Sequence, residues 1–514
     1  MWVEVLVQDC AARIFDFCLV LAVACSTGGC GMWNSALIDL DAFYPVRPEC
    51  QAQVLKTRFK ARTGKTLSVR RWQNAFSADG HLDMAGVLRR IQRGGIHPSI
   101  KGGVWEFLLG CFDPKSTYAE RDEIRRRRRD KYAAWKAECK KMVTDIGSGK
   151  IITDQIITDD GQPIGNPFAD NGVIATDSGS PADKKVNQWK LLLHQIGLDV
   201  DRTDRALVFY ENEANRAKLW DVLSVYAWVD GDIGYVQGMS DICSPMIILL
   251  ENEADAFWCF EHAMRRLREN FRCSARSMGV QSQLAILSQI IKTIDPMLHR
   301  HLEELDGGEY LFAFRMLMVV FRREFSFVDV MCLWEVMWAM EYDPNIYTLY
   351  EGSRNSAAPA QRRDEMKLTS KMLKQYGKFQ RKNVQTGSTD QIGALAVFLA
   401  AGVLEAKNKQ LVKEAKGLDD VANILGEITG NLDAKKALKK ALKVQKKYLS
   451  KKKVQTSTSK STYALDRKIL HLLGTCRPRS HSYSEKIAVQ MVLLLLHAMP
   501  PWLAVASIIL LDGV

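Results

Sequence analysis

Two short stretches of the chain concentrate polar side chains that no hydrophobic pattern explains. The first, residues 194–205, is dense in charge and contains Arg202. The second, residues 232–241, places Gln237 at a glycine-marked turn that opens a predicted helix. An arginine offers a fixed planar cation, and a glutamine amide can both donate a hydrogen bond to water and accept one from it. Both stretches are therefore candidates for chemistry rather than packing.

Other motifs that would carry chemistry fail on spacing. Residues 63–66 (Thr-Gly-Lys-Thr) look like the end of a P-loop, but Phe59 stands where the first glycine is needed. Residues 147–150 fail in the same way, with Thr144 in that place. No Cys-x-x-Cys pair occurs, and the histidines lack metal-ligand spacing. The sequence thus argues against a Walker-type nucleotide site, a zinc ribbon and thioredoxin-like chemistry.

Composition limits the class of protein. The 514 residues are 47% hydrophobic and 25% charged, which excludes a chain disordered throughout and a small disulfide scaffold. Twelve scattered cysteines predict reduced thiols and a cytoplasmic protein. The net charge of +12 allows phosphate-bearing partners or an anionic membrane surface, without choosing between them.

The elements that must position the two stretches are predicted to be helices. Between Trp189 and Tyr350 apolar residues recur at spacings of three and four, and strand alternation is nearly absent. Phe312 to Phe327 and Val330 to Met340 are apolar on most sides, which predicts two central helices. The body is therefore predicted to be all-α.

Together the motifs resemble the TBC-domain Rab GTPase-activating proteins, most closely plant-type members. The family pattern Ile-x-x-Asp-x-x-Arg-Thr and the pattern Tyr-x-Gln-Gly-Met occur at Ile196, Asp199, Arg202, Thr203, Tyr235, Gln237, Gly238 and Met239. Residues 95–105, which end in Trp105, look like the first family motif, and residues 321–327 and 333–335 look like later helices. The resemblance covers roughly residues 92 to 350.

The resemblance implies a V-shaped multi-helix domain and a mechanism. A partner GTPase alone stabilises the charge on its γ-phosphate poorly, and an arginine supplied in trans accelerates hydrolysis. Arg202 and Gln237 occupy the places of the arginine finger and of the glutamine that orients water in trans. Asp199 would hold Arg202, Tyr235 would set the glutamine turn, and the remaining supporting positions are Thr203, Gly238 and Trp105.

The implied partner is a GTP-bound Rab-type GTPase, and the implied role is regulation of vesicle trafficking. Mg²⁺ and GTP would be carried by that partner, so this chain needs no metal or cofactor of its own and is not a self-contained enzyme. The alternatives are a catalytically inactive Rab-binding scaffold and a basic membrane-associated adaptor. The sequence does not name the Rab or the oligomeric state.

Two positions depart from the family pattern or complicate it. Lys101 stands where the first motif usually has arginine, and an ammonium cannot copy the forked bonds of a guanidinium. We expect a local structural consequence there. Asp201 introduces a carboxylate beside Arg202, to be paired with a neighbouring cation or exposed to solvent.

Composition shifts divide the chain further. An N-terminal extension with an apolar stretch is followed by a lead-in, the TBC domain with a surface insertion, a polar linker, a helical extension, a second polar linker and an apolar tail. Their predicted bounds are 1–43, 44–91, 92–350 with the insertion at 145–183, 351–390, 391–454, 455–486 and 487–511. Met32 is an alternative start to Met1.

The C-terminal extension and the tail leave several interpretations open. Residues 431–454 carry ten lysines against Asp433, with an apolar seam at Ala434, Leu438, Ala441, Leu442 and Leu449. This segment is either a solvated helix or, at 434–454, a patch for an anionic membrane surface; nucleic acid is not expected. The tail could anchor in a membrane, pack on the body or be a gene-model artefact. Pro500-Pro501 interrupts it, which favours cytoplasmic protein peripherally bound to endomembranes over a tail anchor.

Overall fold

The computed structural model describes residues 37–154, 181–272, 279–352, 370–386 and 394–452. The chain divides into two units, Met1–Lys446 and Lys447–Val514, and the account below concerns the first. Met32, the N-terminal apolar stretch and the tail 487–511 lie outside the described residues. Within the described ranges, no helix is both long enough and apolar enough to cross a bilayer.

The lead-in combines one small sheet with short helices. Strands β1 (Leu37–Ile38) and β2 (Ala61–Arg62) pair antiparallel, and they are the two strands in the described part of the chain. The helical elements that follow are η1 (Asp41–Phe43), η2 (Pro48–Cys50), α2 (Val69–Gln73), α3 (Met84–Gly94), η3 (Pro98–Ile100) and α4 (Lys101–Leu108).

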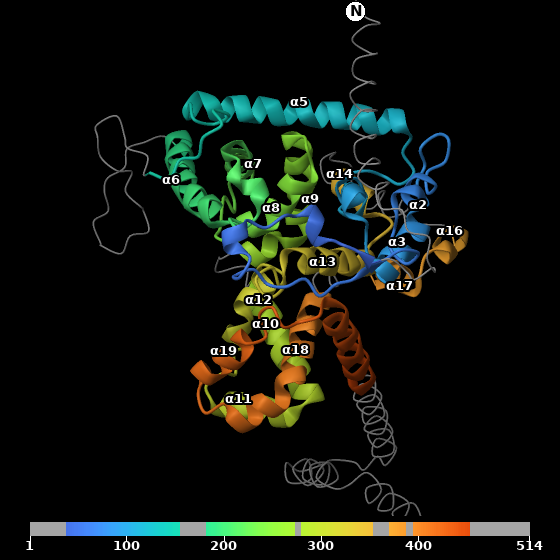
Figure 1. Ribbon diagram of the computed structural model, residues 1–514, viewed down its shortest axis with the longest axis vertical. Helices are drawn as coiled ribbons and strands as arrows, with labels where there is room; N and C mark the ends of the chain where they lie inside the picture. The colour runs from blue at the N-terminus through green and yellow to red at the C-terminus, as the bar shows by residue number, and fades with distance from the viewer. Residues whose placement is uncertain (1–36, 155–180, 273–278, 353–369, 387–393, 453–514) are drawn as a thin grey trace, which may run out of the picture. The chain divides into compact units, whose positions relative to one another are not determined.

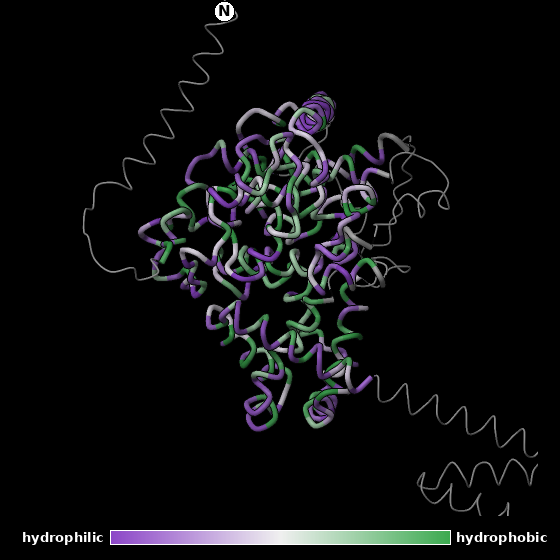
Figure 2. The backbone as a smooth tube through the Cα atoms, turned by 90° about the vertical axis from the view of Figure 1, so that its right-hand side faces the viewer, coloured by the Kyte–Doolittle hydropathy of each residue, from purple (hydrophilic) through white to green (hydrophobic). Residues whose placement is uncertain are grey.

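The charged run after the first motif forms one long helix, α5 (Tyr118–Met142). Thr117 accepts a hydrogen bond from the backbone N–H of Glu120, and Glu120 accepts one from the N–H of Thr117, a capping box that fixes the start. In Figure 1, α5 lies along one side of the helices that contain the two motifs. Figure 2 shows α5 end-on and mostly hydrophilic.

Four helices surround the two motif stretches. They are α6 (Pro181–Arg202), α7 (Glu213–Val229), α8 (Met239–Leu249) and α9 (Glu253–Phe271), with the short η4 (Val208–Glu211) between the first two. Helix α7 packs against α6, α8, α9 and α5. Its residues 219–227 are buried, so α7 is the central helix of this group and the others enclose it.

The next segment is divided into shorter helices. The apolar face from Leu284 to Leu298 belongs to two helices, α10 (Val280–Ile294) and α11 (Pro296–Glu304), because Asp295 caps the second and Pro296 begins it. The predicted helix Phe312–Phe327 is wrong. That segment contains η5 (Leu311–Ala313), α12 (Phe314–Met318) and a turn.

The turn between α12 and α13 (Phe327–Glu341) has an unusual backbone. Val320 has a φ of 48° and Phe321 a φ of 61°, values that β-branched and bulky residues avoid. The fully buried Phe321 ring and a hydrogen bond of 2.8 Å from Trp334 Nε1 to the carbonyl of Val320 hold this turn. Helix α13 itself is buried along nearly its whole length, as predicted for a central helix.

Residues 351–390 are not simply a polar linker. After α14 (Ile346–Gly352), the described part contains α16 (Ser370–Gln375) and α17 (Lys378–Thr386). Buried Gln380 and Asn383 of α17 donate hydrogen bonds to the carbonyls of Ala339 and Met340, at the C-terminal end of α13. These polar residues hydrogen-bond to carbonyls that have no partner within the helix. Composition alone does not distinguish such residues from polar residues exposed to water.

The C-terminal extension contains α18 (Ala394–Glu414), α19 (Leu418–Gly426) and a helix over 434–452. In Figure 1, α18 and α19 lie beside α10, α11 and α12, and α18 contacts all three. The predicted apolar seam is shifted: Leu442 is half-buried and Leu449 is exposed, whereas Val444 is buried. Which residues of the helix are buried depends on the surface that it packs against, and the periodicity of the helix alone does not predict that surface.

The first part of the predicted insertion 145–183 is packed rather than free. Ile146 is fully buried, and the N–H of Gly147 donates to Asp221 at 3.0 Å. A Cβ on Gly197 would clash with the backbone carbonyl of Ile152, so the segment around Ile152 packs directly against α6. Residues 181–183 already belong to α6, and residues 155–180 lie outside the described part.

The described structure confirms the all-α prediction. Its core is built from apolar helix faces, and Figure 2 shows the hydrophobic segments concentrated in the interior of the helical groups. The two motif stretches sit at helix ends in this frame: the first ends α6 and the second precedes α8.

Candidate functional site

Arg202 lies at the surface at the C-terminal end of α6, and a buried carboxylate of the same helix holds its guanidinium. Arg202 is the last residue of the helix, and its guanidinium pairs with the carboxylate of Asp199 one turn earlier. The Arg202 side chain is 57% exposed, whereas that of Asp199 is 5% exposed. A buried carboxylate that grips one side of a guanidinium leaves its other N–H groups for a ligand.

The same carboxylate joins the two motifs. Tyr235 donates a hydrogen bond of 2.6 Å to Asp199 Oδ2, while Arg202 uses Oδ1. Burial, and then the neighbouring Asp199, raises the pKa of Tyr235 well above its usual value, so the phenol stays a donor. Thr203 adds a second link, with Oγ1 at 2.7 Å from the Asp199 carbonyl and 2.8 Å from Ser240 Oγ.

Gln237 occupies an exposed turn whose geometry requires glycine. Gly238 caps α8 with a φ of 103°, and a Cβ there would lie 2.8 Å from the Val319 side chain. Gln237 is exposed, and its amide has no hydrogen-bonding partner among the described residues. The structure therefore brings Arg202 and Gln237 onto two turns tied together by Asp199 and Tyr235.

Salt bridges that the motifs do not reveal fix the loop before Gln237. Arg268 of α9 binds Asp230 and Asp232, each at 2.7 Å, and Arg272 binds Asp232 at 2.6 Å. Tyr226 donates to Asp230 at 2.8 Å. The acidic residues of the loop were visible in the sequence, but their partners on α7 and at the end of α9 were not.

A second set of unpredicted residues fixes the loop after Arg202. Asp204 has a φ of 48° and accepts hydrogen bonds from the buried Arg322 and, at 2.6 Å, from Ser244. Arg322 comes from the turn between α12 and α13, and its neighbour Arg323 binds Asp241 at 2.8 Å. The sequence showed Arg322 and Arg323 within 321–327, but that segment was expected to be a helix. The pattern therefore did not predict that these arginines hold the loop after Arg202.

The lead-in supports the same loop from outside. The N–H of Arg47 donates to the carbonyl of Ala206 at 2.8 Å, and the N–H of Val208 donates to that of Pro45 at 2.9 Å. Asp201 turns away from Arg202 and lies 3.3 Å from Arg216 and 3.7 Å from Arg205. Of the two alternatives that the sequence left for Asp201, pairing with a neighbouring cation is therefore the one observed.

A family model matches the part of the chain that contains both turns. Residues 175–350 match the family model described as the Rab-GTPase-TBC domain. The chain contains a Rab-GTPase-TBC domain. The matched residues include both turns, whereas the first motif at 95–105 lies before the match.

Two relatives and one solved structure show how far the likeness of this TBC protein extends. Rab GTPase-activating protein 22 of Arabidopsis thaliana is 30% identical, over 53% of this chain and 66% of that protein. TBC1 domain family member 17 of Homo sapiens is 33% identical, over 56% of this chain and 39% of that protein. The Ypt/Rab-GAP domain of Gyp1p gives a TM-score of 0.49 at 18% identity, covering 74% of this chain and 98% of that one. The chain thus spans just under two thirds of one relative and well under half of the other.

Trp105, predicted as a supporting site residue, belongs to a different part of the TBC protein. It is fully buried, donates to Glu335 at 3.0 Å, and its ring contacts are with Trp334 and Trp338 of α13. Lys101 binds the same Glu335 oxygen. This cluster fastens α4 to α13, so Trp105 supports the fold and does not contact Arg202 or Gln237.

Within the described residues, no three His, Cys, Asp or Glu side chains are placed to hold a metal ion. The exposed groups that the two family motifs contribute at this site include the Arg202 guanidinium and the Gln237 amide.

Proposed function

We propose that this chain stimulates GTP hydrolysis by a Rab-type small GTPase. The TBC family match and the relatives named as GTPase activators support this function. The observation that carries it is the Asp199 carboxylate, which binds Arg202 and Tyr235 at once and so sets the guanidinium and the glutamine turn together.

In the proposed mechanism Arg202 acts as an arginine finger. The GTP-bound partner brings its own Mg²⁺, and the negative charge that develops on the γ-phosphate oxygens attracts the exposed guanidinium. The buried Asp199 keeps the planar Arg202 guanidinium in one orientation, so the side chain need not reorganise when the reaction occurs. Exposure of the Arg202 head is what contact with another protein requires.

Gln237 is proposed to orient the attacking water in place of the partner's own glutamine. Its amide can accept from the water and donate to a phosphate oxygen. The αL cap at Gly238 and the anchored loop 230–236 hold the turn, which limits the entropy lost when the water is positioned. Hydrolysis would end the Rab's signal in vesicle trafficking, and the lysine-rich segment 434–454 would support peripheral binding to an anionic membrane surface.

A single-turnover assay over a panel of GTP-loaded Rab-type GTPases tests the proposal. We expect at least one GTPase to be accelerated, and Arg202→Ala to lower that stimulation by at least ~10³-fold. Arg205→Ala is the matched control, because Arg205 is at least as exposed, at 65%, and its ion pair among the described residues is with Asp201. Near-normal activity of Arg202→Ala on a responsive GTPase would refute the finger role. A GTPase that binds without acceleration would favour the scaffold.

The role of Gln237 is tested with a partner whose own catalytic glutamine is replaced. Stimulation should persist on this partner with wild-type TBC protein and should collapse with Gln237→Ala. If replacement in the partner alone abolishes stimulation, the glutamine is not supplied in trans.

A further inference from the structure

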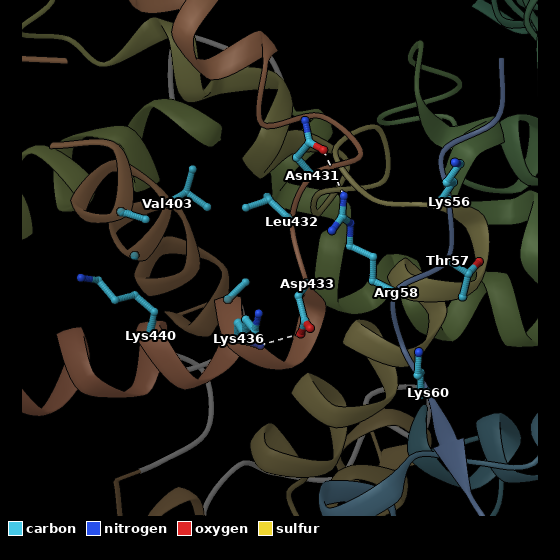
Figure 3. Close-up of a pocket in the computed structure, with 13 residues that line it drawn as sticks. Lys56, Thr57, Arg58, Lys60, Val403, Asn431, Leu432, Asp433, Lys436 and Lys440 are labelled. Atoms are coloured by element: carbon cyan, nitrogen blue, oxygen red, sulfur yellow. Dashed lines mark hydrogen bonds between the residues drawn. The ribbon is translucent and has the colours of Figure 1, made fainter. Parts of the chain in front are cut away.

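A basic groove lies on a part of the molecule that the proposed GTPase site does not use. Two adjoining pockets, of about 680 Å³ and about 600 Å³, share Arg58, Lys60 and Asp433 in their walls. One wall is the extended segment 56–65, and the facing wall is the helical segment 434–442. Figure 3 shows the first pocket, with Lys56 and Lys60 on one wall and Lys436 and Lys440 on the other.

Both walls are held firmly. The N–H groups of Arg58 and Phe59 donate to the two carboxylate oxygens of Asp329, at 2.9 and 2.6 Å. The Arg58 guanidinium donates to the carbonyl of Gly430 at 3.1 Å and to Asn431 at 3.0 Å (Figure 3). On the other wall, Gly402 lets α18 approach Ala441 closely, since a Cβ would lie 3.2 Å from the Ala441 nitrogen. The groove is therefore preformed.

The charge in the groove is strongly one-sided. Its basic lining residues come from three separate parts of the sequence, and Asp433 is the acidic residue among the described lining. Apart from Arg58, which hydrogen-bonds to neutral groups, and Lys435, which lies over an aromatic ring, seven of these cations have no ion-pair partner in the described part of the chain: Lys56, Lys60, Arg62, Lys65, Arg93, Lys436 and Lys439.

The remaining basic side chains show how crowded the positive charge is. Lys440 lies 3.5 Å from Glu405, and the ammonium of Lys435 sits 4.2 Å from the centre of the Phe59 ring. Burial lowers the pKa of Lys435, and the neighbouring cations Arg62 and Lys65 lower it further. Gathering like charges from distant segments costs free energy, and a polyanion would offset that cost.

We propose that this groove binds a small polyphosphorylated ligand, of the inositol phosphate class, free or as a lipid headgroup. Phosphomonoesters carry nearly two charges each, and several lysines converge as point charges on such groups. The volume suits one compact headgroup. Nucleic acid fits less well, because the aromatic ring in the described lining, Phe59, is buried beneath Lys435 and cannot stack on bases.

Titration calorimetry of the full chain with inositol trisphosphate, in about 0.1 M salt, tests the site. Lys60→Ala/Lys439→Ala removes one cation from each wall and should weaken binding by about 30-fold, which corresponds to about 2 kcal/mol. Lys140→Ala/Lys141→Ala removes two exposed lysines of α5 and should change binding by less than about 3-fold. An absence of binding to wild type, or an equal loss in both variants, would overturn the proposal.

A second arm distinguishes the source of the ligand. Phosphatidylcholine vesicles that contain phosphatidylinositol bisphosphate are compared with phosphatidylserine vesicles of matched charge. Preference for the inositol lipid, reduced in Lys60→Ala/Lys439→Ala alone, supports a lipid headgroup; binding of free inositol trisphosphate without vesicle recruitment supports a soluble ligand. Equal recruitment to both vesicles with no binding of the soluble compound would mean diffuse attraction and would contradict the site. Neither assay contains a GTPase, so the outcome is independent of the proposed GTPase activation.

Discussion

At the scale of single residues, Asp199 connects the parts of the candidate site. One of its oxygens binds the exposed Arg202 and the other binds the buried Tyr235. The two neighbours therefore differ in what their loss would do. Removing Arg202 empties the surface side of the carboxylate, whereas removing Asp199 leaves a buried hydroxyl without its acceptor.

This difference predicts two separable phenotypes. Asp199→Ala should lower the free energy of unfolding by about 1–3 kcal/mol, because the Tyr235 hydroxyl is left unsatisfied. Arg202→Ala should lower it by less, under about 1 kcal/mol, because loss of the exposed side chain opens that edge of the Asp199 carboxylate to water instead of leaving it buried without a cation. Chemical denaturation measures both, and the single-turnover assay should show that Asp199→Ala also loses stimulation by about 10²-fold through misplacement of the finger. Equal stability of the two variants would contradict the shared role of Asp199.

At the scale of elements, the contact of α4 with α13 depends on one buried ion pair. Lys101 and Glu335 are both fully buried, and Lys101 and Trp105 converge on the same Glu335 oxygen. The backbone N–H of Ile96 faces this carboxylate as well. The lysine in place of the family arginine thus has a local consequence: the fork that could engage both oxygens is replaced by a single ammonium, which shares Oε1 with Trp105, and Glu335 Oε2 is buried without a hydrogen-bond partner among the described residues.

Breaking this pair on one side should be costly. Lys101→Met should lower the free energy of unfolding by about 3–5 kcal/mol, because it leaves the Glu335 carboxylate buried without its cation. Lys101→Met/Glu335→Gln should recover most of the loss, since the amide remains an acceptor for Trp105 but carries no charge. Denaturant unfolding of both variants measures this. A loss below about 1 kcal/mol in the single variant would show that the pair is not needed to hold the two helices.

The contact of α4 with α5 predicts a pH dependence of stability. Glu106 is 8% exposed, and burial raises its pKa to about 6 despite two contacts of 3.1 Å with Arg125. The folded chain therefore binds this proton more tightly than the unfolded chain, where the value is 4.5. Between these pKa values the folded state holds more protons, so the free energy of unfolding falls as the pH rises.

We expect this group to contribute a fall of about 2 kcal/mol from pH ~4 to pH ~7. Glu106→Gln cannot titrate and should lack that part of the curve, while it keeps an oxygen for Arg125. Unfolding free energies of the two proteins across this range give the difference directly. Curves that remain parallel would show that the pKa of Glu106 is not raised in the folded state.

At the scale of the whole molecule, the TBC protein has two surfaces that differ in how far their charges are paired. At the candidate GTPase site nearly every charge is paired, and Arg202 is presented by a buried carboxylate. In the basic groove the lysines are largely unpaired and the walls are fixed by neutral or backbone contacts. The two surfaces share no residue. The proposed contact with a GTPase and the proposed anion binding therefore do not compete for the same residues.

The sequence by itself determined the helical class and the position of the candidate site. The spacing of apolar residues reports which side of a helix is buried, and Leu219, Val222 and Leu223 lie in the core as that spacing predicts. The polar motifs around Arg202 and Gln237 were visible because each is confined to a few consecutive residues. Local patterns of this kind need no knowledge of the rest of the chain.

The tertiary structure decided what those residues touch. Asp199 and Tyr235 are 36 positions apart, Asp204 and Arg322 are 118 apart, and Arg58 and Gly430 are 372 apart. Such pairs depend on how many helices pack at once, and no local periodicity encodes that packing. For the same reason the lysine-rich helix could be recognised from its composition, but the facing segment 56–65 that turns it into a groove could not. Neither could the turn at Val320 and Phe321, because its backbone is held by contacts from α13 rather than by its own sequence.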